Sequence, residues 1–380
     1  MSSLIVRNGR ILAAQTVLTE AFIEMAEGRI TAIGAPDGHT ADEEIDLDGG
    51  WLLPGFIDTQ VNGGGGVLFN DEPTAQGIAA IGAAHARYGT TAFLPTLISD
   101  EPEVIAAALD AADAAIEAGV PGVVGVHIEG PFINPKRKGI HSEARLRRLD
   151  DAMVELLTRP RRGVVMLTLA PELADPVDVA RLAAAGVVLS AGHTDATFDQ
   201  AAEAFAHGVR GVTHLYNAMS PLQHRAPGVV GASLDHDDVY CGIIADGVHV
   251  AGPALRLAVR AKGADRLMLV TDAMPGVGNG GKPFLIDGRE IFVREGICTD
   301  AAGTLAGSGL DMAGAVRNMV ALARVDVPTA SRMASGTPAA FMGLSDRLGT
   351  LAPGRQADFV ILDAELVPRQ TWIAAKRQPA

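Results

Sequence analysis

The chain has 380 residues, of which 48% are hydrophobic and 20% are charged, enough for one large globular domain and a smaller one. Its 31 basic and 45 acidic residues give a formal net charge of −14, which excludes nucleic acid and anionic membranes as expected partners. We see no leader-like start and no run of about 18 apolar residues. The two cysteines, Cys241 and Cys298, form no disulfide framework or metal motif, so a reducing cytoplasm is the expected compartment.

Both ends of the chain show a pattern typical of β structure. Asn8-Gly9 lies between short apolar runs and predicts a hairpin, and Gly28 marks the turn of a second one. Near the other end, Pro353-Gly354 predicts a turn before a further strand. We expect residues 1–53 and 349–380 to pair into one small β-sandwich domain beside a larger domain.

Between these ends, residues 54–348 alternate short apolar runs with alanine-rich segments of helical length. Eight runs predict strands, at 52–63, 90–98, 122–131, 163–172, 186–194, 208–218, 239–249 and 267–274. After the second run, Ile105, Leu109 and Ala112 recur at helical spacing and predict one buried helix face. Eight β-α units favour an α/β fold, a (β/α)8 TIM-like barrel. The structural alternative, a doubly wound open sheet, lacks a glycine-rich nucleotide fingerprint here.

Residues 275–308 are too many for a plain connection between the last strand and its helix. The core of this stretch, FLIDGREIFV, predicts a hairpin around Asp287-Gly288. We expect the stretch to form a flap near the active site. Cys298 lies within it, and the pattern assigns that thiol no chemical role.

Unusual polar residues occur where the expected barrel strands end, namely Gln60, Asn62, Glu129, His193, His214, His249 and Asp272. Active sites of such barrels lie at the C-terminal ends of the strands, so these side chains are expected to meet. Glu129, His193 and His214 suit zinc or a similar divalent ion and leave one coordination position for water. Bound metal lowers the pKa of water from ~15.7 towards ~7, and Asp272 fits as the general base.

The other histidines have plainer interpretations. His127 lies two residues before Glu129 and points the same way along an extended strand, which predicts a packed core residue or a group that supports the site. Five more occur in loops or helical stretches and are interpreted as surface or structural residues: His39, His85, His207, His224 and His236.

Several longer strings resemble the N-acetylglucosamine-6-phosphate deacetylases of the amidohydrolase superfamily. They are PGFIDTQVNGGGG, HIEGPFINPKRKGIHS, SAGHTDAT, THLYNAMSPLQHRAPGVVG, ADGVHV and LVTDAM. The likeness runs essentially from end to end. HIEGPF with KGIH downstream, and THLYNAM followed by RAPG, are specific to this family. PGFID and GRQADFVILD are shared across the superfamily.

The resemblance implies catalytic roles for individual positions. Glu129, His193 and His214 match the protein ligands of a catalytic metal, and Asp272 matches the general acid/base. His141, in KGIHS, matches the histidine that polarises the amide carbonyl and stabilises the oxyanion.

The resemblance also implies contacts to the substrate. Asn217, Ala218 and Arg225 match contacts to its phosphate and sugar, and a guanidinium suits phosphate because it forms paired, charge-assisted hydrogen bonds. His141 and His249 are further substrate-binding positions, the latter on the sugar. Members of this family are commonly homodimers, with part of the site near the subunit interface.

One departure from the wider superfamily concerns the metal count. Many amidohydrolases carry His-x-His after the first strand to hold a second metal, whereas this chain has Gln60 and Asn62 there. The fourth run, GVVMLTLAPE, also lacks a lysine that could form a bridging carbamate. Both absences predict one divalent metal per subunit, zinc first, with iron, manganese or cobalt as alternatives. They count against a cyclic-amide hydrolase.

These observations predict hydrolytic deacetylation of N-acetylglucosamine 6-phosphate to glucosamine 6-phosphate and acetate. The nearest alternative is the same reaction on N-acetylgalactosamine 6-phosphate, which differs at one hydroxyl. A non-catalytic binding protein on the same fold is a third reading. It is disfavoured because Glu129, His193, His214 and Asp272 are all retained.

Overall fold

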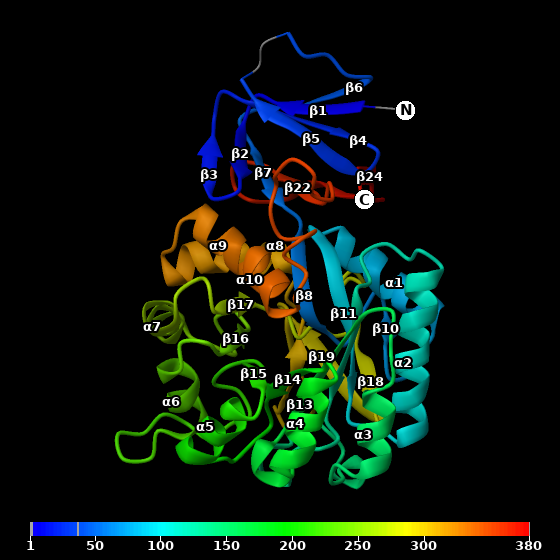
Figure 1. The fold of residues 1–380 in the computed structure, drawn as a ribbon, viewed down its shortest axis with the longest axis vertical. Helices are drawn as coiled ribbons and strands as arrows, with labels where there is room; N and C mark the ends of the chain where they lie inside the picture. The colour runs from blue at the N-terminus through cyan, green and yellow to red at the C-terminus, as the bar shows by residue number, and fades with distance from the viewer. Residues whose placement is uncertain (1–2, 36–37, 380) are drawn as a thin grey trace.

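In a computed structural model, the chain is described at residues 3–35 and 38–379. Residues 1–2, 36–37 and 380, which include the outermost positions of the predicted small domain, lie outside the described residues. Figure 1 shows a β-rich region that carries both chain ends above a larger α/β region. No helix of the described ranges has both the length and the apolar character needed to cross a membrane.

The larger region is built around one eight-stranded parallel sheet that curls into a barrel, which confirms the predicted (β/α)8 fold. Its strands neighbour one another in chain order: β8 (Phe56–Val61), β11 (Thr90–Ile98), β12 (Gly125–Glu129), β13 (Val164–Leu169), β14 (Val188–Ala191), β15 (Val209–Val212), β16 (Tyr240–Ile243) and β17 (Leu267–Leu269). The strands are almost wholly buried because helices cover them outside and side chains fill the inside.

The barrel closes between β17 and β8 through side chains as well as backbone. Val61, the last residue of β8, forms a parallel bridge with Ala273, which follows β17. The buried Asp58 carboxylate accepts the Thr271 hydroxyl at 2.5 Å and its backbone N–H at 3.3 Å. This clamp fixes the backbone on which Asp272 stands.

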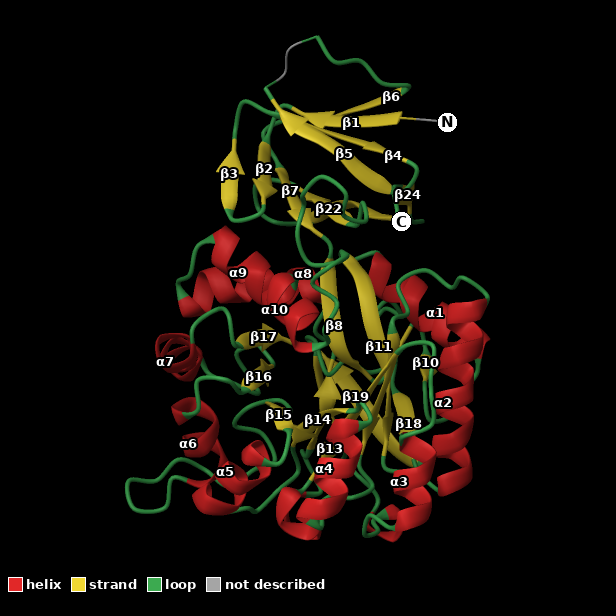
Figure 2. Ribbon diagram, in the orientation of Figure 1, coloured by secondary structure: helices red, strands yellow, loops and turns green. Residues whose placement is uncertain are grey.

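Helices alternate with the strands and form the outer layer (Figure 2). They are α1 (Ala75–Ala86), α2 (Pro102–Glu117), α3 (Asp151–Leu157), α4 (Pro176–Ala184), α5 (Phe198–Ala206), α6 (Gly228–Asp235), α7 (Gly252–Lys262) and α8 (Met312–Asn318). The predicted apolar face of α2 is confirmed, because Ile105, Leu109 and Ala112 are all buried. After α8 come a π-helical turn (Met319–Ala323), α9 (Val327–Ala334) and α10 (Gly336–Phe341), which lie between the barrel and the β-rich region. Short 3-10 turns occupy Pro135–Arg137, Glu143–Arg145 and Pro171–Leu173.

Strands from both ends of the chain form the β-rich region, which we call the terminal β module. One sheet has the order β5 (Arg29–Gly34), β4 (Phe22–Ala26), β1 (Ser3–Arg7) and β6 (Glu43–Asp46). The other has the order β24 (Lys376–Arg377), β23 (Pro368–Ile373), β22 (Phe359–Leu362), β7 (Trp51–Pro54), β2 (Arg10–Ala13) and β3 (Thr16–Leu18). Apolar residues of both sheets share one core, as in a sandwich.

Two local predictions in this module have opposite outcomes. The turn at Gly28 joins β4 and β5 as an antiparallel hairpin, as predicted. The hairpin predicted at Asn8-Gly9 is wrong, because β1 and β2 belong to different sheets. Asn8 adopts a left-handed backbone (φ 62°) and its carbonyl accepts the Gly49 N–H, so the dipeptide is a corner between sheets.

The long insertion after β17 folds into a four-stranded antiparallel sheet of β18 (Phe284–Ile286), β19 (Arg289–Arg294), β20 (Ile297–Thr299) and β21 (Leu305–Ser308). The hairpin at Asp287-Gly288 is confirmed by the pairing of β18 with β19. Cys298 is fully buried in a small apolar cluster that also contains Met274. A second small ribbon, β9 (Gly63–Gly64) with β10 (Val67–Leu68), follows β8.

Candidate active site

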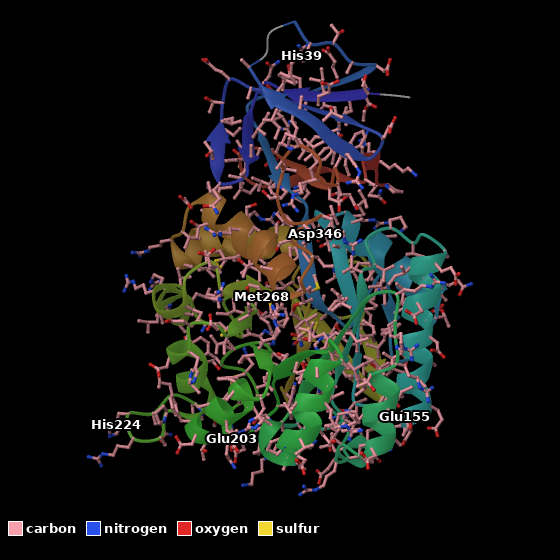
Figure 3. All side chains as sticks on the ribbon, in the orientation of Figure 1. His39, Glu155, Glu203, His224, Met268 and Asp346 are labelled. Carbon is pink, nitrogen blue, oxygen red and sulfur yellow. The ribbon has the colours of Figure 1, made fainter. Side chains whose placement is uncertain are left out.

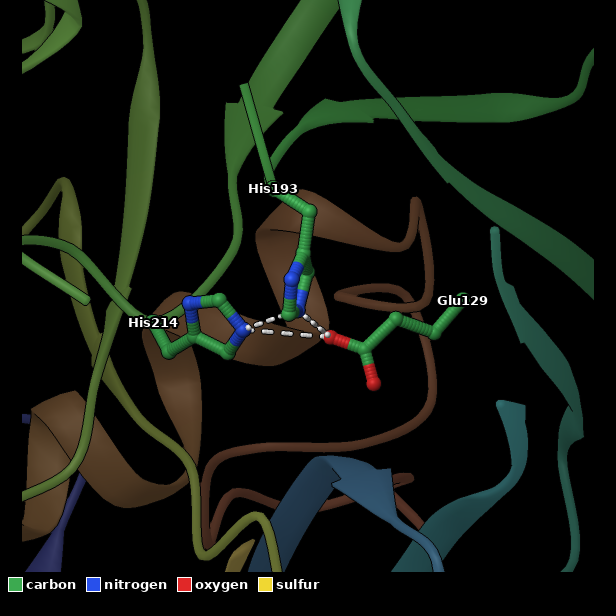
Figure 4. A group of neighbouring side chains, drawn as sticks. All are labelled: Glu129, His193 and His214. Carbon is green, nitrogen blue, oxygen red and sulfur yellow. Dashed lines mark hydrogen bonds and ion pairs between the residues drawn. The ribbon is translucent and has the colours of Figure 1, made fainter. Parts of the chain in front are cut away.

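Three side chains that could hold a metal ion converge at the C-terminal end of the barrel (Figure 4). Glu129 Oε1 lies 3.3 Å from His193 Nε2 and 3.2 Å from His214 Nε2, and the two Nε2 atoms are 3.0 Å apart. All three residues are buried. Burial alone would raise the pKa of Glu129, but the two imidazoles beside it hold that pKa well below its usual range.

This arrangement fits a divalent metal ion. Ligand atoms that sit ~2.0–2.2 Å from a tetrahedral zinc lie roughly 3.3–3.5 Å from one another, close to the separations seen here. The His193 Nδ1 is 2.8 Å from the carbonyl oxygen of Arg137, which can only accept a hydrogen bond. Nδ1 therefore carries the proton, and the lone pair of Nε2 faces Glu129 and His214.

The chemistry-bearing residues after the strands share an uncommon backbone conformation. His193, His214 and Asp272 have φ values of 48°, 33° and 53°, in the left-handed region that residues other than glycine rarely adopt. Each follows the end of its strand by two or three residues. The left-handed turn ends the extended course of the chain at these positions, and such outliers cluster at functional sites.

Two amides bond Asp272, and one of them connects it to the ligand cluster. The Gln60 Nε2 donates to Glu129 Oε1 at 2.9 Å and to Asp272 Oδ1 at 3.1 Å, and the Asn62 Nδ2 donates to the same Asp272 oxygen at 2.7 Å. Burial and the nearby Glu129 charge raise the pKa of Asp272 to about 6. The Gln60 amide thus bridges the two carboxylates, whereas the Asn62 amide donates to Asp272 alone.

His141 stands beside His193, with ring centroids 4.5 Å apart. The Ser99 hydroxyl lies 2.7 Å from His141 Nδ1, and the Ser99 backbone N–H donates to the same nitrogen at 3.3 Å. Burial, with His193 nearby, lowers the pKa of His141 to about 3, so the ring is neutral. Because a backbone N–H can only donate, Nδ1 is the acceptor and the proton of the neutral ring is on Nε2.

These groups line one cavity of about 510 Å³. Among the residues around it are Asn62, Glu129, His141, His193, His214, Asn217, Ala218, His249 and Asp272, together with Lys136 and Arg137. His249 Nδ1 is 2.5 Å from Asp246 Oδ2, so a carboxylate orients this imidazole. Gly303, Thr304 and Leu305 bring the insertion to the cavity wall, where the flap was expected. Its opening stays a prediction.

Comparison with known proteins agrees with this geometry. The sequence model described as "Amidohydrolase family" matches residues 51–379. The chain belongs to the amidohydrolase family. This amidohydrolase is 42% identical to N-acetylgalactosamine-6-phosphate deacetylase of Shewanella sp. (strain ANA-3), over 98% of the chain and 95% of the relative. It is 39% identical to N-acetylglucosamine-6-phosphate deacetylase of Bos taurus, over 98% and 90%. The crystal structure of N-acetylglucosamine-6-phosphate deacetylase from Pasteurella multocida superposes with a TM-score of 0.96 at 32% identity, covering 100% of both chains.

One predicted substrate contact of this amidohydrolase does not reach the cavity. Arg225 is exposed and lies on the loop between β15 and α6. Its neighbour His224 is labelled in Figure 3, where this loop projects away from the barrel. Within a single chain, the structure therefore brings Asn217, Ala218 and His249 to the cavity but leaves Arg225 outside it.

The remaining histidines of the amidohydrolase lie where a structural role was expected or on its surface. His85 is fully buried in α1 with its Nε2 2.9 Å from the Gly63 carbonyl oxygen, and burial lowers its pKa to about 4. His127 is fully buried inside the barrel, 2.8 Å from the Thr168 hydroxyl, and burial lowers its pKa also to about 4. His39, His207 and His224 are exposed, and His236 is half-buried.

Sequence reasoning missed three groups that support the site. Ser99 bonds His141, the Arg137 carbonyl bonds His193, and Asp246 bonds His249. Only Asp246 gave a local signal, since it precedes His249 by three residues within ADGVHV. Ser99 lies 42 residues from His141, so this contact depends on the closed barrel.

Proposed function

We propose that this amidohydrolase hydrolyses the acetamide of N-acetylglucosamine 6-phosphate, giving glucosamine 6-phosphate and acetate. The observation that carries the proposal is one cavity that joins the buried Glu129–His193–His214 cluster to the Asp272 carboxylate and the His141 imidazole. Similarity over 98% of the chain to proteins named for this chemistry supports it.

We propose one divalent metal ion per chain, held by Glu129, His193 and His214. Zinc suits one carboxylate and two imidazoles, and iron, manganese or cobalt suit them as well. When bound, the ion supplies Lewis acidity, which polarises the amide carbonyl and makes a water molecule more acidic. The Gln60 and Asn62 amides favour a single ion, because their N–H groups point at the carboxylates.

Asp272 carries the proton transfers in this proposal. Its carboxylate takes a proton from the attacking water, which adds to the amide carbon. The protonated carboxyl then donates that proton to the departing nitrogen, and the carbon–nitrogen bond breaks. A buried carboxyl with a pKa raised towards neutrality can perform both steps near pH 7.

His141 stabilises the oxyanion in this proposal. Ser99 occupies Nδ1, so Nε2–H is free to donate to the oxygen on which negative charge develops. A neutral imidazole with a fixed tautomer serves here as a donor and not as a base.

The sugar phosphate contacts are proposed from Asn217, Ala218, His249 and Arg225. The first three line the cavity, whereas Arg225 projects from its own chain. We therefore propose a cytoplasmic homodimer in which Arg225 reaches the partner's cavity and binds the phosphate. Lys136 and Arg137 also line the cavity, and both pair with the single carboxylate of Asp195, so the three groups together carry one positive charge.

N-acetylgalactosamine 6-phosphate is the second candidate substrate. A relative named for that substrate is 42% identical to this chain, against 39% for the bovine relative named for the gluco isomer. The two substrates differ only at the C4 hydroxyl. Both candidates use the same metal cluster, base and oxyanion donor.

Acetate release from both epimers, measured with the metal content of the same preparation, tests the proposal. We expect about one divalent ion per chain, turnover that chelation abolishes and metal restores, and a higher kcat/KM for the gluco epimer. A higher kcat/KM for the galacto epimer would leave the proposed mechanism in place and make N-acetylgalactosamine 6-phosphate the proposed substrate. Metal-loaded protein that releases acetate from neither would overturn it.

A further inference from the structure

The barrel interior changes from apolar to polar one layer below Glu129, His193 and His214, which we call the metal cluster. Leu94, Met166 and Val188 belong to one apolar cluster that fills the bottom of the barrel. Two residues further along the same three strands stand Thr96, Thr168 and Ser190, all completely buried. Alternate residues of a strand share a face, so these hydroxyls form the next layer up. Barrel interiors are usually filled by branched apolar residues.

His127 and Thr213 complete this layer, and we call the five residues the hydroxyl belt (Thr96, His127, Thr168, Ser190 and Thr213). The Thr213 Oγ1 lies 2.7 Å from Ser190 Oγ and 2.7 Å from Thr168 Oγ1. Thr168 Oγ1 lies 2.8 Å from His127 Nε2, and His127 Nδ1 lies 3.3 Å from Thr96 Oγ1. The belt therefore connects β11, β12, β13 and β14 with Thr213, the residue directly after β15.

Only one assignment of donors and acceptors along the belt gives every proton an acceptor. If Ser190 donates to Thr213, Thr213 to Thr168 and Thr168 to His127 Nε2, then His127 Nδ1–H donates to Thr96. The Thr96 hydroxyl then donates to the Leu94 carbonyl oxygen at 3.2 Å, and every proton has an acceptor. In the opposite direction the Ser190 proton has no acceptor among the described residues.

Belt residues, or a glycine packed against them, lie within two residues of each member of the metal cluster along the chain. Thr213 directly precedes His214, and His127 lies two residues before Glu129 on β12. Gly192, which precedes His193, is wedged between belt residues: a Cβ there would lie 2.7 Å from Thr168 Cγ2 and 2.9 Å from Thr213 Cβ. The belt therefore borders the three chain segments that carry the ligands.

We propose that the hydroxyl belt is a positioning layer that sets the spacing of Glu129, His193 and His214 and thereby the affinity of the site for metal. The proposal rests on the proposed function, because it concerns the same metal cluster. None of its residues lines the cavity proposed to hold the substrate.

The test is titration of metal-free protein with Co²⁺, followed by the visible absorption of the bound ion, with no substrate present. Thr213→Val keeps the shape, leaves the Ser190 hydroxyl without its partner and removes one of the two partners of Thr168. We expect its Kd for Co²⁺ to rise about tenfold, with a changed absorption spectrum. In the loaded enzyme kcat falls while KM is unchanged, because the belt does not contact substrate.

Two matched variants separate positioning from general packing. Thr213→Ser keeps the hydroxyl and should restore wild-type affinity and spectrum. Thr90→Val removes a buried hydroxyl of β11 that has no partner in the described residues, and should leave Co²⁺ binding unchanged. If Thr213→Val does not fold, Ser190→Ala, at the end of the belt, is the variant that tests the proposal. We expect its Kd for Co²⁺ to rise by less than that of Thr213→Val, and an unchanged Kd would overturn the proposal.

A Kd and spectrum of Thr213→Val equal to wild type would overturn the proposal, whatever its thermal stability. Equal losses in Thr213→Val and Thr90→Val would do the same. Since these readouts need no turnover, a failure of the proposed substrate assignment would leave them unaffected and separately visible.

Discussion

The lower half of the barrel interior is held by apolar packing, whereas the upper half is held by hydrogen bonds between polar side chains. The lower half is packed with apolar side chains from regular strands, closed below by Phe341 of α10. The upper half holds the hydroxyl belt, the metal cluster and Asp272, with left-handed backbone at three of the chemical residues. Packing therefore stabilises the fold from below, while hydrogen bonds and local strain fix the geometry above.

Removal of metal gives the largest effect expected in the upper half. Chelation of the bound ion should abolish acetate release, because the remaining residues cannot activate water alone. Addition of Zn²⁺ or Co²⁺ should restore it. The measurement is activity against metal content; full activity in metal-free protein would contradict the role of the cluster.

Asp272→Asn comes next. The amide keeps the shape but cannot take a proton from water, so kcat should fall by roughly 10³-fold. Metal content should stay at the wild-type level, since Asp272 is not among the three clustered ligands. Turnover within tenfold of wild type would remove Asp272 as the general base.

Phe341→Ala tests the lower half. The ring is completely buried against the barrel strands, and its loss should cost about 3–5 kcal/mol of folding free energy. Chemical unfolding measures this change, and metal affinity of the folded fraction should be unchanged. Leu285→Ala, at a side chain that is 57% exposed, is the control and should change stability by less than about 0.5 kcal/mol. A weakened metal site in Phe341→Ala would contradict the separation of the two halves.

Ser99→Ala has the smallest effect of the series. The backbone N–H of residue 99 still donates to His141 Nδ1, so only part of the orienting interaction is lost. We expect kcat to fall by about tenfold with metal content unchanged. Steady-state kinetics on the better epimer check it, and an effect as large as that of Asp272→Asn would indicate a direct chemical role for Ser99.

The sequence predicts the regular features because each has a local signal. Apolar runs separated by helical periodicity gave the barrel, and a polar residue that ends an apolar run, such as Glu129 or His214, stands out. Contacts between distant strands have no such signal. Ser99 and the belt threonines lie within or directly after ordinary strands, and only the closed barrel brings each to its partner.

Turn chemistry was a weaker guide than periodicity. Asn-Gly favours a tight hairpin, but the strands on either side of Asn8-Gly9, β1 and β2, pair with other strands in different sheets. The same dipeptide conformation serves a corner equally well, and tertiary pairing decides between them. The position of Arg225 outside the cavity could likewise not be predicted from the local sequence, because an exposed loop has no hydrophobic periodicity.

The six-stranded sheet of the terminal β module has a consequence for biosynthesis. On the ribosome β7 is made early, but its neighbour β22 follows only after the whole barrel has emerged. One edge of β7 therefore stays unpaired during translation, directly ahead of the first barrel strand. Since β22 lies between β7 and β23, release of the C-terminal residues is the event that completes the sheet. A nascent chain halted before residue 359 should have a formed barrel but an unfinished module.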